Sequence, residues 1–353
     1  MALPSSNASI RAIDAIDDLF ASVGLRHGRR QILSAGYVPQ ARHTWQQVPA
    51  PQAQELARAR TVQALKSSVL AAAGVRHGFA TRSGGASTVY LKIGEESGEQ
   101  HAENAGDLNF GFTASDTREH VIENRARLTN HVYGETRPLV TLRQIHSSLM
   151  HRVGREHAGE GAVLAGDGMM TDEPGVVLGI QTADCVPVLL ADRKRRAVAA
   201  FHAGWRGTLA RIVERGVGRM RLEFGSDPKD LVAAIGPAIG QCCYPVGENV
   251  EHEFRSQFSY ADELFREVYD SDPVRKKYPM LFLSARAPGH SNLGPNLHLD
   301  LSEANRRQLL AAGVQTEAIE VLGQCTSCRT DLFFSYRAEQ GFTGRMLAVI
   351  AQD

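Results

Sequence analysis

Cys185, His202 and His146 are the residues of this chain whose types and positions could carry chemistry. Cys185 and His202 lie in the stretch QTADCVPVLLADRKRRAVAAFHAGWRG, and His146 lies in TLRQIHSS. Each of the three stands beside a short apolar run, at a place where a strand would begin or end. A cysteine thiolate and two imidazoles can bind a metal ion, or they can act as a nucleophile with its base.

Three interpretations of these side chains remain open from spacing alone, because the separations between them form no motif. A catalytic zinc takes three protein ligands, two histidines and one cysteine being a known set, and it activates a water near neutral pH. Alternatively, the Cys185 thiolate is a nucleophile that His202 or His146 activates. The third interpretation is that the three are ordinary buried side chains.

The elements that must position these residues are short apolar strands with helices between them. Strands are expected at residues 138–144, 186–191, 197–201, 231–235, 318–322, 332–336 and 346–350. Helices are expected at residues 115–131, 206–224 and 248–258. Runs rich in valine and leucine between charged or turn-forming residues are typical of buried strands. The pattern therefore predicts buried strands with helices between them.

The sequence pattern changes near residue 74, where short apolar runs and glycine turns begin. Residues 1–73 contain helix-like segments and no convincing site, so we predict a partly helical N-terminal extension followed by a catalytic domain over residues 74–353. Residues 89–106 form a polar insertion within that domain. On length alone the chain could form two domains, although larger α/β folds reach this size as one unit.

Composition excludes several classes of protein. The chain has 353 residues, 43% of them hydrophobic, and its 39 basic residues balance its 39 acidic ones, so a basic nucleic-acid-binding face is not expected. The sequence has no apolar stretch near the roughly 20 residues of a membrane helix. The five cysteines, an odd number, favour a reducing compartment over a disulfide framework. We therefore expect a cytoplasmic protein that binds neither nucleic acid nor membrane.

Other apparent motifs carry less weight. Histidine and glutamate at 101 and 103, followed much later by Cys325 and Cys328, hold parts of a zinc deaminase signature but lack its proline and its spacing. Cys325 and Cys328 could be a redox pair or half of a structural zinc site. The adjacent Cys242 and Cys243 suggest poor ligand geometry, so we expect loop thiols without a role. A copper cluster is not expected, since no His-x-His pair is present.

Five motifs taken together resemble the YfiH/LACC1 family, whose members were once labelled polyphenol oxidases or laccases. They are RQIH, DGMMTDEPGVVLGIQTADCVPVLLAD, HAGWRG, GPAIGQCCYPVG and FFSYRAEQGFTGR, in family order from about residue 74 to the C-terminus. The resemblance implies a single α+β domain, with mixed β-sheets and flanking helices, that holds one catalytic Zn²⁺. Carried over motif by motif, the zinc ligands are His146, Cys185 and His202.

The implied activity is phosphorolysis of purine nucleosides together with deamination of adenosine. Adenosine, inosine, guanosine and methylthioadenosine would be the substrates, phosphate the second substrate, and the protein a monomer or homodimer. This sequence departs from the family pattern at Pro245 and Ala338, where the family often has glutamate and arginine. These departures bear on substrate preference and on the entrance to the pocket.

Four further residues are expected in the site, besides Asp184. Arg82, beside the Gly84–Gly85 turn, and Arg206, near a helix start, are predicted to bind phosphate, because guanidinium groups and helix N-termini favour anions. Asn109 and Gln144 lie in family motifs and are predicted to contact substrate.

Asp184, next to Cys185, is predicted either to shuttle a proton or to orient a ligand. Two other functions remain open. One is a cysteine hydrolase or deamidase that uses Cys185 and a histidine, and the other is a non-catalytic nucleoside-binding protein.

Overall fold

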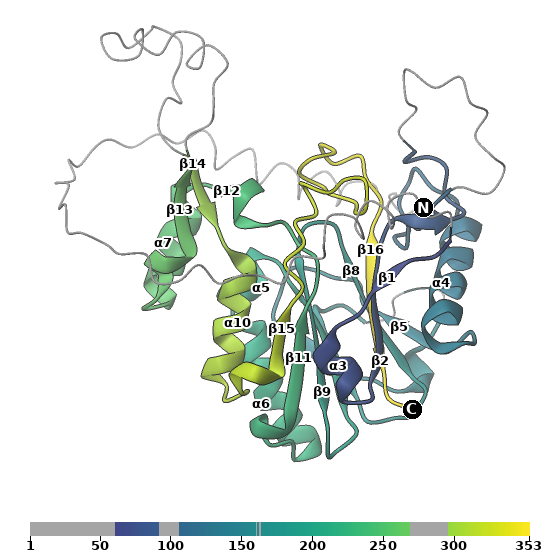
Figure 1. The fold of residues 1–353 in the computed structure, drawn as a ribbon, viewed down its shortest axis with the longest axis horizontal. Helices are drawn as coiled ribbons and strands as arrows, with labels where there is room; N and C mark the ends of the chain where they lie inside the picture. Colours follow the sequence, from purple (N-terminus) through teal and green to yellow (C-terminus); the bar gives the residue numbers. More distant parts are fainter. Residues whose placement is uncertain (1–60, 92–105, 160, 162–163, 269–295) are drawn as a thin grey trace, which may run out of the picture. The chain divides into compact units, whose positions relative to one another are not determined.

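Two mixed β-sheets form the centre of the protein (Figure 1). The structure is a computed structural model that describes residues 61–91, 106–159, 161, 164–268 and 296–353. One sheet has the order β1-β2-β16-β8-β5, and the other has the order β15-β11-β9-β10-β7-β6. Each sheet contains antiparallel pairs. The five-stranded sheet ends on the parallel pair β8 with β5, and the six-stranded sheet ends on a parallel pair at both edges, β7 with β6 and β11 with β15. The α+β class with mixed sheets is confirmed.

The strands are short, and most are buried along their whole length. The five-stranded sheet contains β1 (Ala64–Leu65), β2 (Arg76–Ala80), β16 (Met346–Ala351), β8 (Val177–Thr182) and β5 (Leu139–Thr141). The six-stranded sheet contains β15 (Ile319–Val321), β11 (Leu231–Ile235), β9 (Val186–Asp192), β10 (Val198–Ala203), β7 (Gly168–Thr171) and β6 (Met150–Arg152). Smaller sheets are formed by β12 (Pro245–Val246), β14 (Asn296–Leu299) and β13 (Phe265–Val268), and by β3 (Ser83–Gly85) and β4 (Gly106–Asp107).

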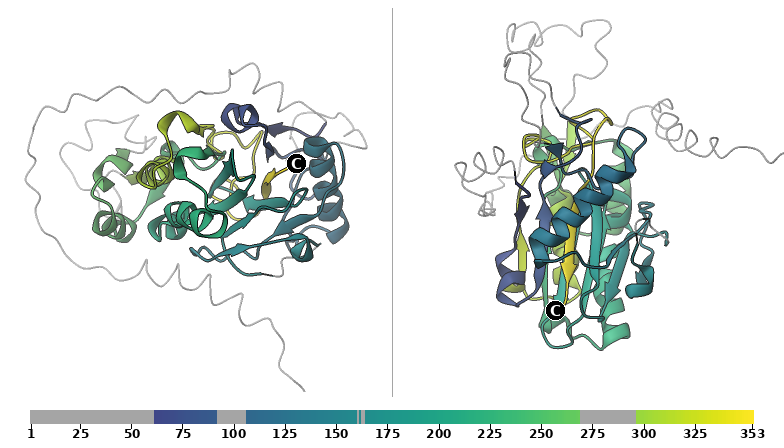
Figure 2. Two further views of the ribbon diagram at one scale, coloured as in Figure 1. Left: turned by 90° about the horizontal axis from the view of Figure 1, so that it is seen from below. Right: turned by 90° about the vertical axis from the view of Figure 1, so that its right-hand side faces the viewer.

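Helices cover the outer faces of the two sheets. The helices are α3 (Ser68–Ala72), α4 (Arg118–Tyr133), α5 (Trp205–Leu209), α6 (Ile212–Phe224), α7 (Glu248–Gln257) and α10 (Leu301–Ala311). Helix α4 contacts β2, whereas α6 contacts β10 and α10 contacts β11. Seen from below, α6 and α10 lie on one side of the strands and α4 lies on the opposite side (Figure 2). The sheets are therefore enclosed between helices.

Strand β16 shows how the two sheets and α4 share their cores. Met346, Ala348 and Ile350 face the large core between the sheets, while the alternate residues Leu347 and Val349 face the smaller core with α4. Successive side chains of a strand point to opposite faces, and both faces of β16 are buried. A continuous apolar run is the expected sequence of such a strand.

Two predicted elements differ from the structure. The helix expected over residues 206–224 is broken into α5 and α6, with Arg211 at the break in the left-handed region at φ 57°. The break lets α6 pack closely on β10, where a Cβ at Gly216 would lie 2.3 Å from the Phe201 ring. Residues 332–336 form a loop with turns instead of a strand. The apolar run Leu332 to Phe334 in this loop is buried in the protein core.

The N-terminal part of the described chain joins the main body. Strand β1 pairs with β2, and Leu70 of α3 is fully buried. The helix expected over residues 10–23 and most of the 89–106 insertion lie outside the described residues. The helix expected over residues 52–73 is not continuous, since its described part contains β1 and the short α3. The division of the chain at residue 73 stays a prediction. Among the described residues, no helix combines the length and apolar composition needed to cross a bilayer.

Candidate metal centre

The pairing of β9 with β10 brings Cys185 beside His202. The two strands are antiparallel neighbours, with His202 opposite Pro187 and Ala203 opposite Val186. Cys185 immediately precedes β9, and His202 lies near the end of β10, so both reach the same edge of the six-stranded sheet. Residues distant in sequence therefore meet because of strand register.

His146 completes the group from the loop that follows β5. Its Nε2 lies 4.0 Å from the Cys185 Sγ, and its ring centroid lies 5.0 Å from that of His202. One ligand atom from each of the three residues lies within 4.8 Å of the other two. His202 is buried, Cys185 is half-buried and His146 is exposed, so the group is open to solvent on the His146 side.

Asp167 holds the two histidines in place, and sequence reasoning missed it. Its Oδ1 accepts hydrogen bonds from the His202 Nδ1–H at 2.8 Å and from the His146 backbone N–H at 3.0 Å. Its Oδ2 accepts from the backbone N–H groups of Ile145 and Ser147 and from the Ser147 hydroxyl. The bond to Nδ1 leaves the Nε2 of His202 as the atom available for a ligand. In the sequence Asp167 precedes Gly168, and an Asp-Gly pair is typical of a turn.

Charge interactions shift the pKa values of this group towards an ion pair. Burial opposes ionisation of the Cys185 thiol, but the His202 charge and the hydrogen bond to His146 outweigh it and lower the pKa of Cys185 to about 6. Burial likewise disfavours a charged His202, yet the Cys185 thiolate and the hydrogen bond to Asp167 raise the pKa of His202 to about 9. Cys185 is therefore stabilised as a thiolate.

The backbone around the group is adapted to close packing. A Cβ at Gly204 would lie 3.0 Å from the Cys185 Sγ and 3.1 Å from the His146 ring, which leaves little room for a side chain. His146 and Asp184 both adopt positive φ, at 56° and 91°. Non-glycine residues in this region are uncommon, and they cluster at functional sites.

Asp184 lies next to Cys185, but its carboxylate is engaged with other loops. Its Oδ1 accepts from the Thr326 hydroxyl at 2.6 Å and its Oδ2 accepts from the Arg337 backbone N–H at 2.7 Å. Its backbone carbonyl accepts from the Ile239 N–H. Of the two predicted roles, these contacts favour orientation, although what Asp184 orients is the loops around Cys185 and not a ligand side chain.

The hydrogen bonds of Arg82 differ from the predicted contact with phosphate. The side chain is buried, with 5% exposed, and lies in ion pairs with Asp107 and Glu339. Its Nε and Nη groups donate to both carboxylate oxygens of Asp107, to Glu339 and to the carbonyls of Thr330 and Tyr90. A guanidinium has five N–H donors, and all of them are used within the protein. Arg82 therefore has no donor left for phosphate.

Asn109 and Gln144 also make structural contacts in place of the predicted substrate contacts. Asn109 is fully buried. Its side-chain NH₂ donates to the Gly111 carbonyl and to Asp116, and its Oδ1 accepts from the backbone N–H groups of Gly111 and Arg345. The Gln144 amide donates to the carbonyl of Gln181 and accepts from its N–H. This exchange continues the parallel β5–β8 pairing beyond the end of β5 and fixes the approach to His146.

Arg206 lies exposed at the start of α5, close to the metal-ligand group. Its guanidinium stacks on Trp205 with 4.4 Å between Cζ and the ring centroid. Burial raises the pKa of Tyr244, as does the Cys185 charge, while Arg337 and Arg206 act against the rise. Tyr244 therefore interacts electrostatically with Cys185 and with both arginines. Arg337 lies in the motif FFSYRAEQGFTGR, and no role in the site was predicted for it from the sequence.

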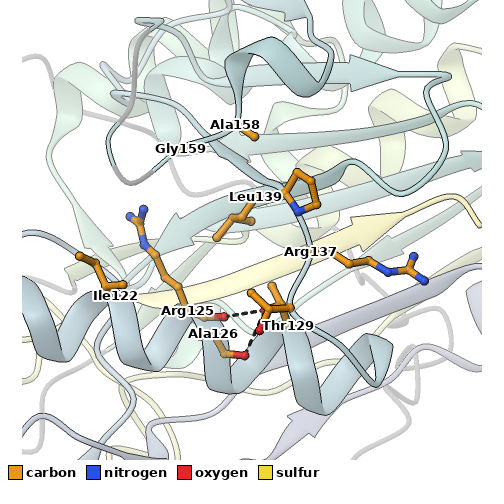
Figure 3. A pocket seen from close by; sticks show the side chains of 10 residues that line it. Ile122, Arg125, Ala126, Thr129, Arg137, Leu139, Ala158 and Gly159 are labelled. Carbon is orange, nitrogen blue, oxygen red and sulfur yellow. Dashed lines mark hydrogen bonds between the residues drawn. The ribbon is translucent and has the colours of Figure 1, made fainter.

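A separate cavity of about 340 Å³ lies between α4 and the segment that leads into β5 (Figure 3). Its lining includes Ile122, Arg125, Thr129, Arg137 and Leu139. The residues that line it do not include any of the predicted site residues. This cavity is therefore distinct from the site at the edge of the six-stranded sheet.

Replacing Asp167 with asparagine is expected to weaken metal binding about 10- to 100-fold, the usual effect of losing a carboxylate that orients a histidine ligand. The asparagine would place an NH₂ group against either His202 or Ser147, because both carboxylate oxygens accept hydrogen bonds. Competition with a chromophoric chelator measures the zinc affinity. Asp192→Asn is the matched control, since Asp192 is equally buried but lies at the far end of β9. Equal zinc affinities of the two variants would contradict the role of Asp167.

Comparison with known proteins identifies relatives over most of the chain. Residues 76–353 match the family described as multi-copper polyphenol oxidoreductase laccase. The purine nucleoside phosphorylase YlmD of Geobacillus stearothermophilus is 37% identical over 251 residues, covering 69% of this chain and 83% of that protein. Adenosine deaminase RL5, from an unknown prokaryotic organism, is 32% identical over 224 residues, covering 62% and 76%. The crystal structure of Bacillus licheniformis hypothetical protein YfiH matches with a TM-score of 0.66 and 31% identity, covering 84% of this chain and 98% of that one.

Proposed function

Because the chain belongs to the YfiH family described as multi-copper polyphenol oxidoreductase laccase, we propose that it is a zinc-dependent purine nucleoside phosphorylase. Its substrates would be phosphate and adenosine, inosine, guanosine or methylthioadenosine, and it would also deaminate adenosine. The names of two relatives, a purine nucleoside phosphorylase and an adenosine deaminase, support these activities. The observation that carries the proposal is the convergence of His146, Cys185 and His202 around Asp167.

The chemistry of these donors fits a catalytic zinc ion. Two imidazole nitrogens and one thiolate are a known three-ligand set that leaves a fourth position for a small molecule. When bound, zinc supplies a Lewis-acid centre. Asp167 would hold the His202 tautomer and the His146 backbone, so that both Nε2 atoms keep their direction. His146 is the exposed member of the group, and substrate would approach from its side.

Arg206, with Arg337, is the proposed phosphate-binding residue. Both interact electrostatically with Tyr244, which in turn interacts with the Cys185 charge, so positive charge lies near the group. Guanidinium groups bind phosphate through two parallel hydrogen bonds. In this proposal the phosphate is attracted by Arg206 and Arg337, and Asp184 keeps the Arg337 backbone in place.

A cysteine hydrolase is the second candidate, and one observation favours it. Interactions with His202 and His146 lower the pKa of Cys185 to about 6, although burial opposes this shift. Such a thiolate could attack a carbonyl or amidine carbon with a histidine as proton donor. Thiol-specific labelling that abolishes turnover while the metal content stays unchanged would favour this candidate.

Product analysis with adenosine tests the proposed function. We expect adenine to form only when phosphate is present, and inosine to form with or without phosphate. Chromatography of the reaction separates adenine, inosine and hypoxanthine, and elemental analysis of the same protein reports zinc and copper. A protein without zinc that gains no activity when zinc is added would contradict the metal-dependent mechanism. Formation of none of these products would contradict both activities.

A further inference from the structure

Four cysteines outside the proposed active site converge on one point. Cys242, Cys243, Cys325 and Cys328 each place an Sγ within 4.8 Å of the other three. The Cys328 Sγ lies 3.5 Å from that of Cys242 and 3.3 Å from that of Cys243. Cys325 and Cys328 were expected to be loop thiols without a role, and their closeness to Cys242 and Cys243 was not predicted. A 3₁₀ turn over Gln241–Cys243 directs both adjacent side chains towards Cys328, which local spacing did not indicate.

The sheet brings the two cysteine pairs together. Strands β11 and β15 are parallel neighbours, so the loops that follow them leave from the same edge. Ala238 in the first loop then forms a parallel bridge with Cys325 in the second. The Ala238 N–H donates to the Gln324 carbonyl at 3.2 Å, and the Thr326 N–H donates to the Ala238 carbonyl at 3.0 Å. These bonds hold the two loops side by side up to the cysteines.

The sulfur separations suit a single tetrahedral ion. A zinc–sulfur bond of about 2.3 Å places tetrahedral sulfurs roughly 3.8 Å apart. The separations of 3.3 and 3.5 Å, and the upper limit of 4.8 Å, lie on either side of that value. An iron–sulfur cluster would require wider spacing, because several iron and sulfide atoms would have to lie between the cysteines. The four thiols are therefore spaced for one ion.

The backbone at Gly240 is also arranged around these sulfurs. The Gly240 N–H donates to the Cys325 Sγ at 3.2 Å, a contact that stabilises a negative sulfur. A Cβ at Gly240 would lie 3.2 Å from the Cys242 Sγ, so glycine leaves the sulfurs their space.

A disulfide explains the arrangement less well than a metal ion. A disulfide joins two sulfurs at about 2.0 Å, whereas all four of these cysteines are free thiols in the structure. Cys328 is almost equally close to Cys242 and Cys243, so the geometry selects neither partner. Four sulfurs gathered around one point are typical of ligands that share a central ion.

We propose that Cys242, Cys243, Cys325 and Cys328 bind one structural zinc ion, distinct from the proposed catalytic ion. Sites with four cysteines are closed, and they stabilise folded segments directly. Here the ion would join the loop after β11 to the loop after β15. The second loop contains Thr326, whose hydroxyl donates to Asp184 beside Cys185. The ion would therefore support the backbone that carries the active-site cysteine.

Zinc stoichiometry of the full chain tests this proposal. We expect two equivalents of zinc in the wild type, one in Cys185→Ala and one in the double variant Cys325→Ser with Cys328→Ser. Ser327→Ala lies in the same loop and should keep both ions. If the double variant retains as much zinc as the wild type, the cysteine site is overturned. The zinc that Cys185→Ala loses reports on the proposed catalytic ion only. A failure of that site is therefore distinguished from a failure of the four-cysteine site.

A second measurement avoids variants that fail to fold. Cys185→Ala protein, which retains all four cysteines of the proposed site, is loaded with Co²⁺ and its absorption is recorded. We expect strong thiolate-to-cobalt charge-transfer bands, and we expect bound zinc to protect four thiols from alkylation as counted by mass spectrometry. Equal alkylation with and without zinc, a disulfide among the four, or bound iron with sulfide would each overturn a structural zinc site.

Discussion

Replacing Cys185 with alanine is expected to abolish nucleoside turnover and to remove one equivalent of zinc. The change deletes the one sulfur of the group and leaves His146 and His202 as a two-ligand site open to solvent. The loss of affinity should exceed the roughly 100-fold upper range seen when only an outer hydrogen-bond partner is lost. Equilibrium dialysis against zinc and the adenosine assay measure the two effects on the same protein.

Cys185→His separates a ligand role from a nucleophile role. Histidine is an equally common zinc ligand, so this variant should recover part of the zinc binding and some turnover if Cys185 is a ligand. A histidine cannot form the thioester or thioimidate that a cysteine nucleophile forms. Cys185→Ala protein that keeps its full zinc content but has no activity would instead favour the cysteine hydrolase.

Replacing Arg82 with methionine is expected to destabilise the protein by about 3–5 kcal/mol, the usual result of removing one partner of a buried ion pair. Asp107 and Glu339 would lose their cation in a region where Arg82 itself is 5% exposed. The free energy of unfolding in urea measures the loss. Arg219→Met is the matched control: Arg219 pairs with Glu223 on the surface of α6, where such a pair contributes about 0.3–0.5 kcal/mol.

Substitutions at Arg82 and at Arg206 separate a structural role from phosphate binding. Folded Arg82→Met protein should keep its KM for phosphate, because every donor of Arg82 is used within the protein. Arg206→Met should raise the KM for phosphate and should lower the unfolding free energy less than Arg82→Met does, because Arg206 is exposed. A raised KM in the Arg82 variant without a loss of stability would restore its predicted role as a phosphate ligand.

The strands around the site and the residue types within it could be predicted from local patterns in the chain. The apolar runs at 186–191 and 197–201 are β9 and β10, and the run at 231–235 is β11. Such runs are local properties of the chain, because a strand buried on both faces needs apolar residues at successive positions. The order of five motifs then identified the family, and three residues within those motifs, His146, Cys185 and His202, meet in the structure.

Tertiary structure alone decided how each polar side chain uses its donors and acceptors. Arg82 and Asn109 looked able to bind a ligand, yet long-range partners such as Asp107 and Arg345 occupy them. Asp167 looked like a turn residue, and strand register made it the support of two histidines. A sequence shows which groups a residue carries, but whether those groups remain available depends on neighbours that only packing brings together.

The cysteines illustrate the same limit. Cys242 and Cys243 lie 86 and 85 residues before Cys328 along the chain. No local pattern joins them, and the parallel pairing of β11 with β15 is what aligns their loops. The sequence determined which side chains could be ligands, and the strand order of the six-stranded sheet decided which of them form a common site.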